Sequence, residues 1–333
     1  MNVIFINLRK YLFTIMAILF IITLLIFSEN NFIATSTGLD IFITSVFPSL
    51  FPFLVATEIL YNSNFIHILE KNTKKIIPKL FNVPPKASIA IILGFISGYP
   101  IGAKITANLK KDKYITQAEA ERLLSFTNNS SPIFVISTIG ISIYGNKKIG
   151  FTLLFIHILS SILVGLFFRF WKYNDKEYID YSCISLNENN KLKVVPNTID
   201  IFIQAVRNSI LTILQIGGFV IIFSVILSIL KSTGMLNILS YLFSLTGIPE
   251  NFAQGFIYGL FEISNGLNLI KNIYLSNNIL SLLTIYFILG FGGISILFQI
   301  YSIINKEHIS IKPYIYGKLL QASISVILAC IIF

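Results

Sequence analysis

Two short segments place polar and helix-breaking residues inside apolar stretches of this sequence. Residues 97–102 read Ser-Gly-Tyr-Pro-Ile-Gly, and residues 127–132 read Thr-Asn-Asn-Ser-Ser-Pro. A helix that begins within a membrane exposes free N–H groups and the positive end of its dipole, which attract an anion. Amide and hydroxyl side chains add donors and acceptors. The two segments therefore predict a binding site for a small polar or anionic solute.

A weaker pair of segments with similar character lies in the C-terminal half. Residues 251–270 form a glycine-interrupted apolar segment that contains Glu262, and residues 280–304 contain Gly292 and Gly293. A carboxylate inside an apolar segment is costly in lipid and is functional by default. The candidate solute-binding residues from both pairs of segments are Ser97, Gly98, Tyr99, Pro100, Gly102, Lys104, Thr127, Asn128, Asn129, Ser130, Ser131, Glu262, Asn265, Gly292, Gly293, Ser295 and Gln299.

Several candidates also have a structural explanation. The glycines of residues 290–293 suit close helix packing equally well. Lys104 either adds its charge to an anion site or extends to the cytoplasmic surface. Glu262 either contacts a solute, an ion or a proton, or it pairs with a basic residue. Glu58 lies closer to a helix end, and both explanations stay open for it.

Catalytic and metal-binding patterns are absent from the sequence. Cys183 and Cys330 have neither a CxxC partner nor a neighbouring His pair, and the histidines are dispersed, so the ligand spacing of a metal site is missing. No nucleophile lies at motif spacing from a base, and no phosphate loop is present. The sequence predicts no catalytic residue, no metal and no cofactor, and therefore a protein that is not an enzyme.

The elements that position the candidate residues belong in a membrane. Of the 333 residues, 55% are hydrophobic and 12% are charged, whereas a soluble domain carries about a quarter charged residues. The formal net charge is +10, but the basic residues form short clusters between apolar segments, as the positive-inside rule describes. We expect an all-α polytopic membrane protein that contacts the lipid bilayer and binds no nucleic acid.

The chain divides by composition into four parts. The first contains a membrane span at residues 11–27, which we expect to be retained because no signal-peptide cleavage pattern follows, and an outer loop at residues 28–40 that lacks basic residues. The four parts are an N-terminal span and outer loop at 1–40, a first membrane repeat at 41–171, a cytoplasmic polar linker at 172–200, and a second membrane repeat at 201–333.

Residues 87–109 are long enough to cross a membrane but are interrupted at Gly98–Gly102 and flanked on both sides by lysines. Positive charge on both sides is typical of a re-entrant hairpin that enters and leaves on the cytoplasmic face. A broken helix follows at residues 119–144, and residues 151–171 return to the cytoplasm.

The second half repeats this order of elements. An apolar helix at 204–230 and an amphipathic segment at 235–245 precede the two interrupted segments, and a final span at 313–333 contains Lys318. An odd number of crossings in each half inverts the halves relative to each other. This topology places the N-terminus and most of the 25 basic residues in the cytoplasm. Inverted repeats with broken helices and re-entrant hairpins are typical of secondary transporters and channels.

Four motifs make the chain similar to a known family: 47–53, 94–104, 128–132 and 290–293. The chain resembles the YlbJ-type sporulation integral membrane proteins of endospore-forming bacteria, which carry the Gate, or nucleoside recognition, domain. The resemblance spans nearly the whole chain and implies a role in spore development and cortex formation. It also implies solute transport in the membrane that faces the mother cell, which is the outer forespore membrane, or in the cell membrane.

The resemblance offers dipicolinate as the first candidate solute. A nucleoside is the second, because Gate domains are shared with concentrative nucleoside transporters. We expect a carrier that works by alternating access around the two hairpins. A non-transporting scaffold that recruits cortex-building proteins through residues 172–200 is the alternative, and a membrane enzyme acting on lipid-linked wall precursors is weaker. Other sporulation membrane proteins or a second copy of the chain are the expected protein partners.

Overall fold

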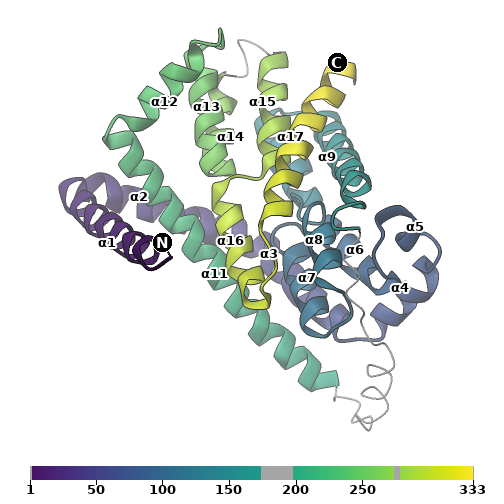
Figure 1. The fold of residues 1–333 in the computed structure, drawn as a ribbon. Helices are drawn as coiled ribbons and strands as arrows, with labels where there is room; N and C mark the ends of the chain where they lie inside the picture. Colours follow the sequence, from purple (N-terminus) through teal and green to yellow (C-terminus); the bar gives the residue numbers. More distant parts are fainter. Residues whose placement is uncertain (1, 174–197, 274–277, 333) are drawn as a thin grey trace.

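The protein, described here as a computed structural model, has defined positions for residues 2–173, 198–273 and 278–332. The described residues form helices and connecting turns without any strand (Figure 1). Two π-helical segments, η1 (Phe42–Val46) and η3 (Phe134–Ile143), and two 3-10 turns, η2 (Pro85–Ala87) and η4 (Asn305–Glu307), complete the set. The α-helices are α1 (Asn2–Ile26), α2 (Ser28–Ile41), α3 (Phe47–Tyr61), α4 (Phe65–Thr73), α5 (Ile77–Phe81), α6 (Ser88–Ser97), α7 (Ile101–Lys111), α8 (Gln117–Leu124), α9 (Lys147–Phe168), α11 (Thr198–Ser232), α12 (Met235–Ser244), α13 (Glu250–Phe261), α14 (Ile263–Ile273), α15 (Asn278–Phe291), α16 (Ile294–Ile304) and α17 (Lys312–Ile332).

Five helical stretches of the described chain are long and apolar enough to cross a membrane. They are Ser28–Tyr61, Lys147–Phe168, Thr198–Ser232, Ile279–Glu307 and Lys312–Ile332. Their outer faces carry large apolar side chains that face away from the protein; Phe167 of α9, for example, is 68% exposed. Such a surface is stable in lipid rather than in water, so the predicted all-α polytopic membrane fold is confirmed.

Residues 28–40, which we predicted to be an outer loop, instead form α2 and continue through η1 into α3. The polar side chains are accommodated within the helix, because the Thr35 and Thr37 hydroxyls donate to carbonyls four residues earlier. Gly38 packs against Ile221 and Ser224 of α11. Internal hydrogen bonds and a flat contact with α11 therefore make this polar stretch helical.

The first interrupted segment is the helical hairpin α6–α7, which turns at residues 98–100. Gly98 has a φ of 87°, a conformation that glycine adopts without steric cost. The next helix is broken as predicted: α8 begins with a capping box between Thr116 and Glu119, residues 125–131 are non-helical, and η3 continues beyond Pro132. Helix α9 closes this half.

The second half contains a similar series. The α13–α14 hairpin turns at Glu262, whose backbone is extended, and the glycines of this segment instead allow α13 and α14 to pack at Gly259 and Gly266. The following helix breaks at Gly292 and Gly293, with φ values of 88° and 83°, and α17 closes the half.

Both halves thus share the order hairpin, broken helix and closing helix. The inverted relation between them stays a prediction, as do the domain boundaries. Figure 1 shows α11 running diagonally through the middle of the molecule, with α1 and α2 on one side and the first hairpin on the other. Within the predicted linker 172–200, residues 174–197, including Cys183, lie outside the described residues.

Candidate functional site

The tip of the first hairpin docks directly onto the break of the first broken helix. The Ala103 backbone N–H donates to Asn128 Oδ1 at 2.7 Å, so the amide of the break satisfies one of the free N–H groups at the start of α7. A Cβ on Gly98 would lie 2.8 Å from Ser131 Cβ, and a Cβ on Gly102 would overlap the Thr127 carbonyl. The glycines therefore permit backbone contact between the two candidate segments.

Several side chains at this contact are fully buried and keep unused hydrogen-bonding capacity. Within the described part of the chain, Ser97 Oγ, Thr127 Oγ1 and Asn128 Nδ2 have no hydrogen-bond partner. All three side chains are at most 1% exposed. A buried polar group without a partner costs about 1–3 kcal/mol, which native proteins retain mainly where the group has a further role.

The other amide of the break belongs to a network that joins three elements. Asn129 Nδ2 donates to the Phe126 carbonyl at 2.8 Å and to Ser161 Oγ of α9 at 3.1 Å. Asn129 Oδ1 accepts a hydrogen bond from Gln321 Nε2 of α17 at 3.0 Å. The backbone N–H of Ser130 donates to His157 Nε2 at 3.2 Å. Asn129 therefore holds the broken helix against both closing helices.

Lys318 lies next to this network, buried at 1% exposure. Its ammonium donates to Gln321 Oε1 at 2.7 Å and lies 5.2 Å from the Tyr99 ring centroid and 6.0 Å from that of Tyr314. From sequence we assigned no functional role to Lys318, Gln321 or Tyr314, and we interpreted His157 as an interfacial or packed residue. A lysine inside a predicted span is itself a signal of function, and it could have identified the first of these.

Lys104 occupies neither of the two positions that the sequence left open. Its ammonium lies 2.7 Å from Glu58 Oε1 of α3 and donates to Thr212 Oγ1 of α11 at 2.9 Å. Asn208 Nδ2 donates to the other Glu58 oxygen at 3.3 Å. Both charged side chains are largely buried, at 16% and 8% exposure, so the charge of Lys104 is compensated within the protein.

Glu262 forms the turn of the second hairpin and caps the helix that follows it. Its Oε2 accepts hydrogen bonds from the Asn265 backbone N–H at 2.8 Å and from Asn265 Nδ2 at 3.1 Å. Among the described residues, no basic side chain forms an ion pair with Glu262. A carboxylate at a helix N-terminus is stabilised by the helix dipole, so this charge is held by α14 itself.

The two halves meet at Tyr99. The Tyr99 hydroxyl donates to the Leu289 carbonyl of α15 at 3.2 Å, and a Cβ on Gly292 would lie 3.1 Å from the same hydroxyl oxygen. Gly293 lies against the carbonyls of Gly259 and Phe261 in the second hairpin. Both hairpin tips thus converge on the break of the second broken helix.

Two predicted residues of the second half form a hydrogen bond with each other instead of with the group around Tyr99. Ser295 and Gln299 are buried one turn apart in α16, where Gln299 Nε2 donates to Ser295 Oγ at 3.4 Å. The structure therefore brings together the candidates of the first hairpin, the first break and Gly292. It directs Lys104 toward α3 and α11, and the hydrogen bonds that it shows for the Glu262 side chain go to Asn265 of the same hairpin.

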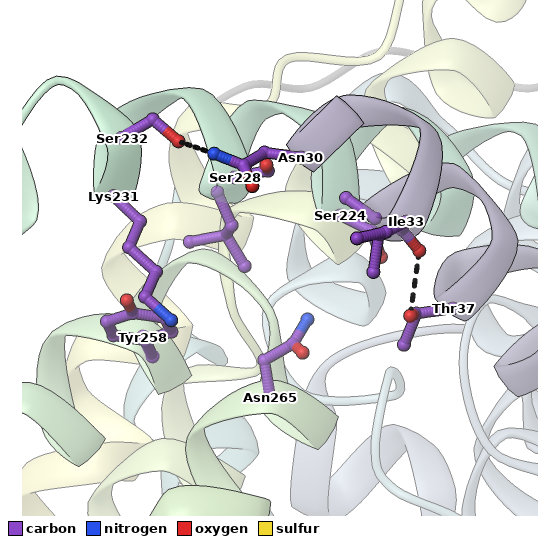
Figure 2. Close-up of a pocket in the computed structure, with 11 residues that line it drawn as sticks. Asn30, Ile33, Thr37, Ser224, Ser228, Lys231, Ser232, Tyr258 and Asn265 are labelled. Carbon is purple, nitrogen blue, oxygen red and sulfur yellow. Dashed lines mark hydrogen bonds between the residues drawn. The ribbon is translucent and has the colours of Figure 1, made fainter. Parts of the chain in front are cut away.

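A pocket of about 450 Å³ opens beside the second hairpin, between α2, α11, α13 and α14 (Figure 2). Asn265 lines it, together with Tyr258 and the side chain of Lys231, which extends toward Tyr258. Across the pocket, Asn30 Nδ2 donates to Ser232 Oγ at 3.2 Å. Its lining offers one cationic group together with hydroxyls and amides, and its volume fits a small organic molecule.

Comparison with known proteins agrees with this architecture. The Gate family, described as nucleoside recognition, matches residues 43–147. Two solved structures of CNTnw, a concentrative nucleoside transporter, share the fold. A variant in an intermediate state has a TM-score of 0.54 and 14% identity, and the match covers 84% of this chain and 76% of that chain. An inward-facing substrate-bound state has a TM-score of 0.52 and 14% identity, and the match covers 85% of this chain and 74% of that chain.

A curated relative is closer in sequence. The sporulation integral membrane protein YlbJ of Bacillus subtilis (strain 168) is 30% identical over an alignment of 315 residues, which covers 88% of this chain and 75% of YlbJ. Because this similarity extends through both halves, the chain is a multi-pass integral membrane protein that belongs to the YlbJ family of sporulation integral membrane proteins.

Proposed function

We propose that this protein transports a small anionic solute, such as dipicolinate, and is needed for spore cortex formation. The observation that carries the proposal is the meeting of two hairpin tips and two helix breaks around Tyr99. Polar backbone breaks at membrane depth are tolerated only where they are buried in protein or line a cavity. In this protein the contact between the first hairpin and the first break also keeps unused hydrogen-bonding groups on Ser97, Thr127 and Asn128.

The family and the fold support this proposal from two directions. The name of the relative YlbJ connects the family to sporulation, and CNTnw, which shares the fold, has been solved in a substrate-bound state. Transporters of this construction move one group of helices against the other around a fixed site. We place the protein in the membrane facing the mother cell, or in the cell membrane, with its N-terminus in the cytoplasm. The proposal includes no catalytic step.

The pocket beside Asn265 is the proposed vestibule of the site. Lys231 at its rim supplies positive charge, which attracts an anion, and Asn265 connects the pocket to the Glu262 turn. A solute that enters here reaches the second hairpin, whose tip carbonyls lie beside Gly293.

A nucleoside is the second candidate solute. It is favoured by the Gate match over residues 43–147. The free groups of Ser97, Thr127 and Asn128 would bind the hydroxyls and ring nitrogens of a nucleoside, because they are uncharged donors and acceptors.

The test is transport by purified protein in lipid vesicles, with labelled dipicolinate and labelled uridine offered separately. We expect dipicolinate uptake by the unmodified protein, and a loss of about tenfold in Asn128→Ala, since one hydrogen bond to a charged group contributes about 1.5–3 kcal/mol. Phe155→Ala is the matched control, because Phe155 is 59% exposed on the lipid-facing side of α9.

The result also separates the two solutes. Uptake of uridine alone would select the nucleoside. Uptake of neither solute, with normal dipicolinate content in spores of a strain that lacks the protein, would contradict transport and favour the scaffold.

A further inference from the structure

Lys318 differs from Lys104, the other largely buried lysine near the hairpins, because no carboxylate of the described residues compensates its charge. Glu58 pairs with Lys104, and Glu121 lies 3.2 Å from Lys172. Glu262 is held by the N-terminus of α14. Lys318 is 1% exposed, and among the described residues no carboxylate forms an ion pair with it.

The environment of Lys318 stabilises its ammonium only in part. Gln321 Oε1 accepts one of the three available hydrogen bonds, at 2.7 Å. The Tyr99 and Tyr314 rings lie 5.2 Å and 6.0 Å away and offer a cation–π attraction that is weaker than an ion pair. A buried charge without a counter-ion is strongly unfavourable, so this position calls for an anion.

The backbone of α17 fixes Lys318 at the junction of the two halves. The neighbouring Gly317 contacts the Ser125 carbonyl so closely that no side chain would fit there. On the other side, Ser325 Oγ donates to the Tyr286 carbonyl of α15 at 2.9 Å, and Gly290 packs on Ala322. The ammonium is therefore held between the first break and the second broken helix, where Tyr99 joins them.

We propose that Lys318 is the counter-charge for the transported solute and binds its carboxylate. Gln321, which is bonded to Asn129 of the first break, orients the ammonium. The inference rests on the proposed function and names the solute class as a small organic carboxylate. It transfers to Lys318 the role that the sequence gave to Lys104. Because a nucleoside is neutral, Lys318 would give it no comparable advantage.

The experiment measures how dipicolinate and uridine shift the thermal unfolding midpoint of the full-length protein in detergent. We compare the unmodified protein with Lys318→Met, which keeps the aliphatic stem, with Lys318→Arg, which keeps the charge, and with Lys148→Met, which removes an exposed charge outside the site. We expect Lys318→Met to weaken apparent dipicolinate affinity at least about tenfold, as the loss of a hydrogen bond to a charged group would. Lys318→Arg should retain most of the affinity, and Lys148→Met all of it.

A second readout distinguishes this role from a structural one. Without any ligand, Lys318→Met should unfold at a higher temperature than the unmodified protein, because an unpaired buried charge is removed. Unchanged dipicolinate affinity in Lys318→Met would overturn the inference, and so would failure of both Lys318→Met and Lys318→Gln to fold. If the unmodified protein binds neither probe, the proposed function itself fails. If it binds uridine alone, the anionic solute and the carboxylate assignment to Lys318 fail, and the nucleoside is selected. If it binds dipicolinate with the same affinity in Lys318→Met, only the assignment to Lys318 fails.

Discussion

The two helix breaks of this protein are built in different ways. The first, at residues 125–131, is joined to α7, α9 and α17 by hydrogen bonds of the Asn128 and Asn129 side chains. The second consists of Gly292 and Gly293, both at positive φ, and is joined to the first hairpin through Tyr99. Dense side-chain bonding fixes a backbone, whereas glycine leaves it free to change conformation. We infer from this difference that the first break is the fixed part of the site and that the second break is the part suited to move.

The largest effect is expected at the contact between the first hairpin and its break. Gly102→Val should prevent recovery of folded protein, because its side chain would overlap the Thr127 carbonyl; overpacking of this kind costs about 3 kcal/mol or more. The measurement is the yield of monodisperse protein after extraction in detergent. Normal yield would show that the first break is adaptable, and the contrast with the second break would be lost.

Two of the buried carboxylates, Glu58 in the first half and Glu262 in the second, provide the next comparison. Glu58→Gln leaves Lys104 without a counter-charge and should cost about 3 kcal/mol, the lower end for breaking a buried pair, since both side chains retain some exposure. Glu262→Gln still accepts from Asn265 and should cost less than about 1 kcal/mol. Thermal unfolding midpoints of the two variants test this order, and a larger drop for Glu262→Gln would reverse the comparison.

A small effect on stability, well below that of Glu58→Gln, is expected at the second break. Gly292→Ala puts a side chain at a φ of 88° and should cost about 1 kcal/mol. Its effect on transport rate should be larger than on solute affinity, because the glycine serves movement rather than contact.

The control for this variant is Gly218→Ala in α11, where an added Cβ has open space and no positive φ is involved. That substitution should leave the transport rate unchanged and should not lower the unfolding midpoint, because alanine is favoured over glycine inside a helix. An equal loss of solute affinity and rate in Gly292→Ala would place the second break in the binding surface instead.

Most of the fold followed from local sequence signals. Proline, glycine and clustered amides interrupted apolar helices at 98–100, at 125–131 and at Gly292, because these residues disrupt helical hydrogen bonding wherever they occur. The α2 helix was missed because its stability comes from α11, through the close contact at Gly38. The turn at Glu262 was also less evident, since the neighbouring glycines are used for packing.

The candidate site was only partly predictable for a related reason. Local composition identified the residues at the breaks, but partners from distant helices decide what each side chain does. Glu58 and Thr212 compensate Lys104 from α3 and α11, whereas Lys318 has no such partner within the described residues. Which lysine keeps its charge available depends on the packing of three helices and could not be read from spacing.

The length of α11 connects two sites that are far apart. Its 35 residues extend for about 52 Å, against a hydrocarbon thickness of about 30 Å, so the helix either tilts strongly or projects beyond the bilayer. About a third of the way along the helix, Asn208 and Thr212 hold the Glu58–Lys104 pair, and near its C-terminal end Lys231 lines the pocket. These two positions are about 30–35 Å apart along the axis. A rotation of α11 by about 10° around the ion pair would therefore move the rim of the pocket by about 6 Å, and so a small angular change at the ion pair becomes an opening or closing movement at the pocket.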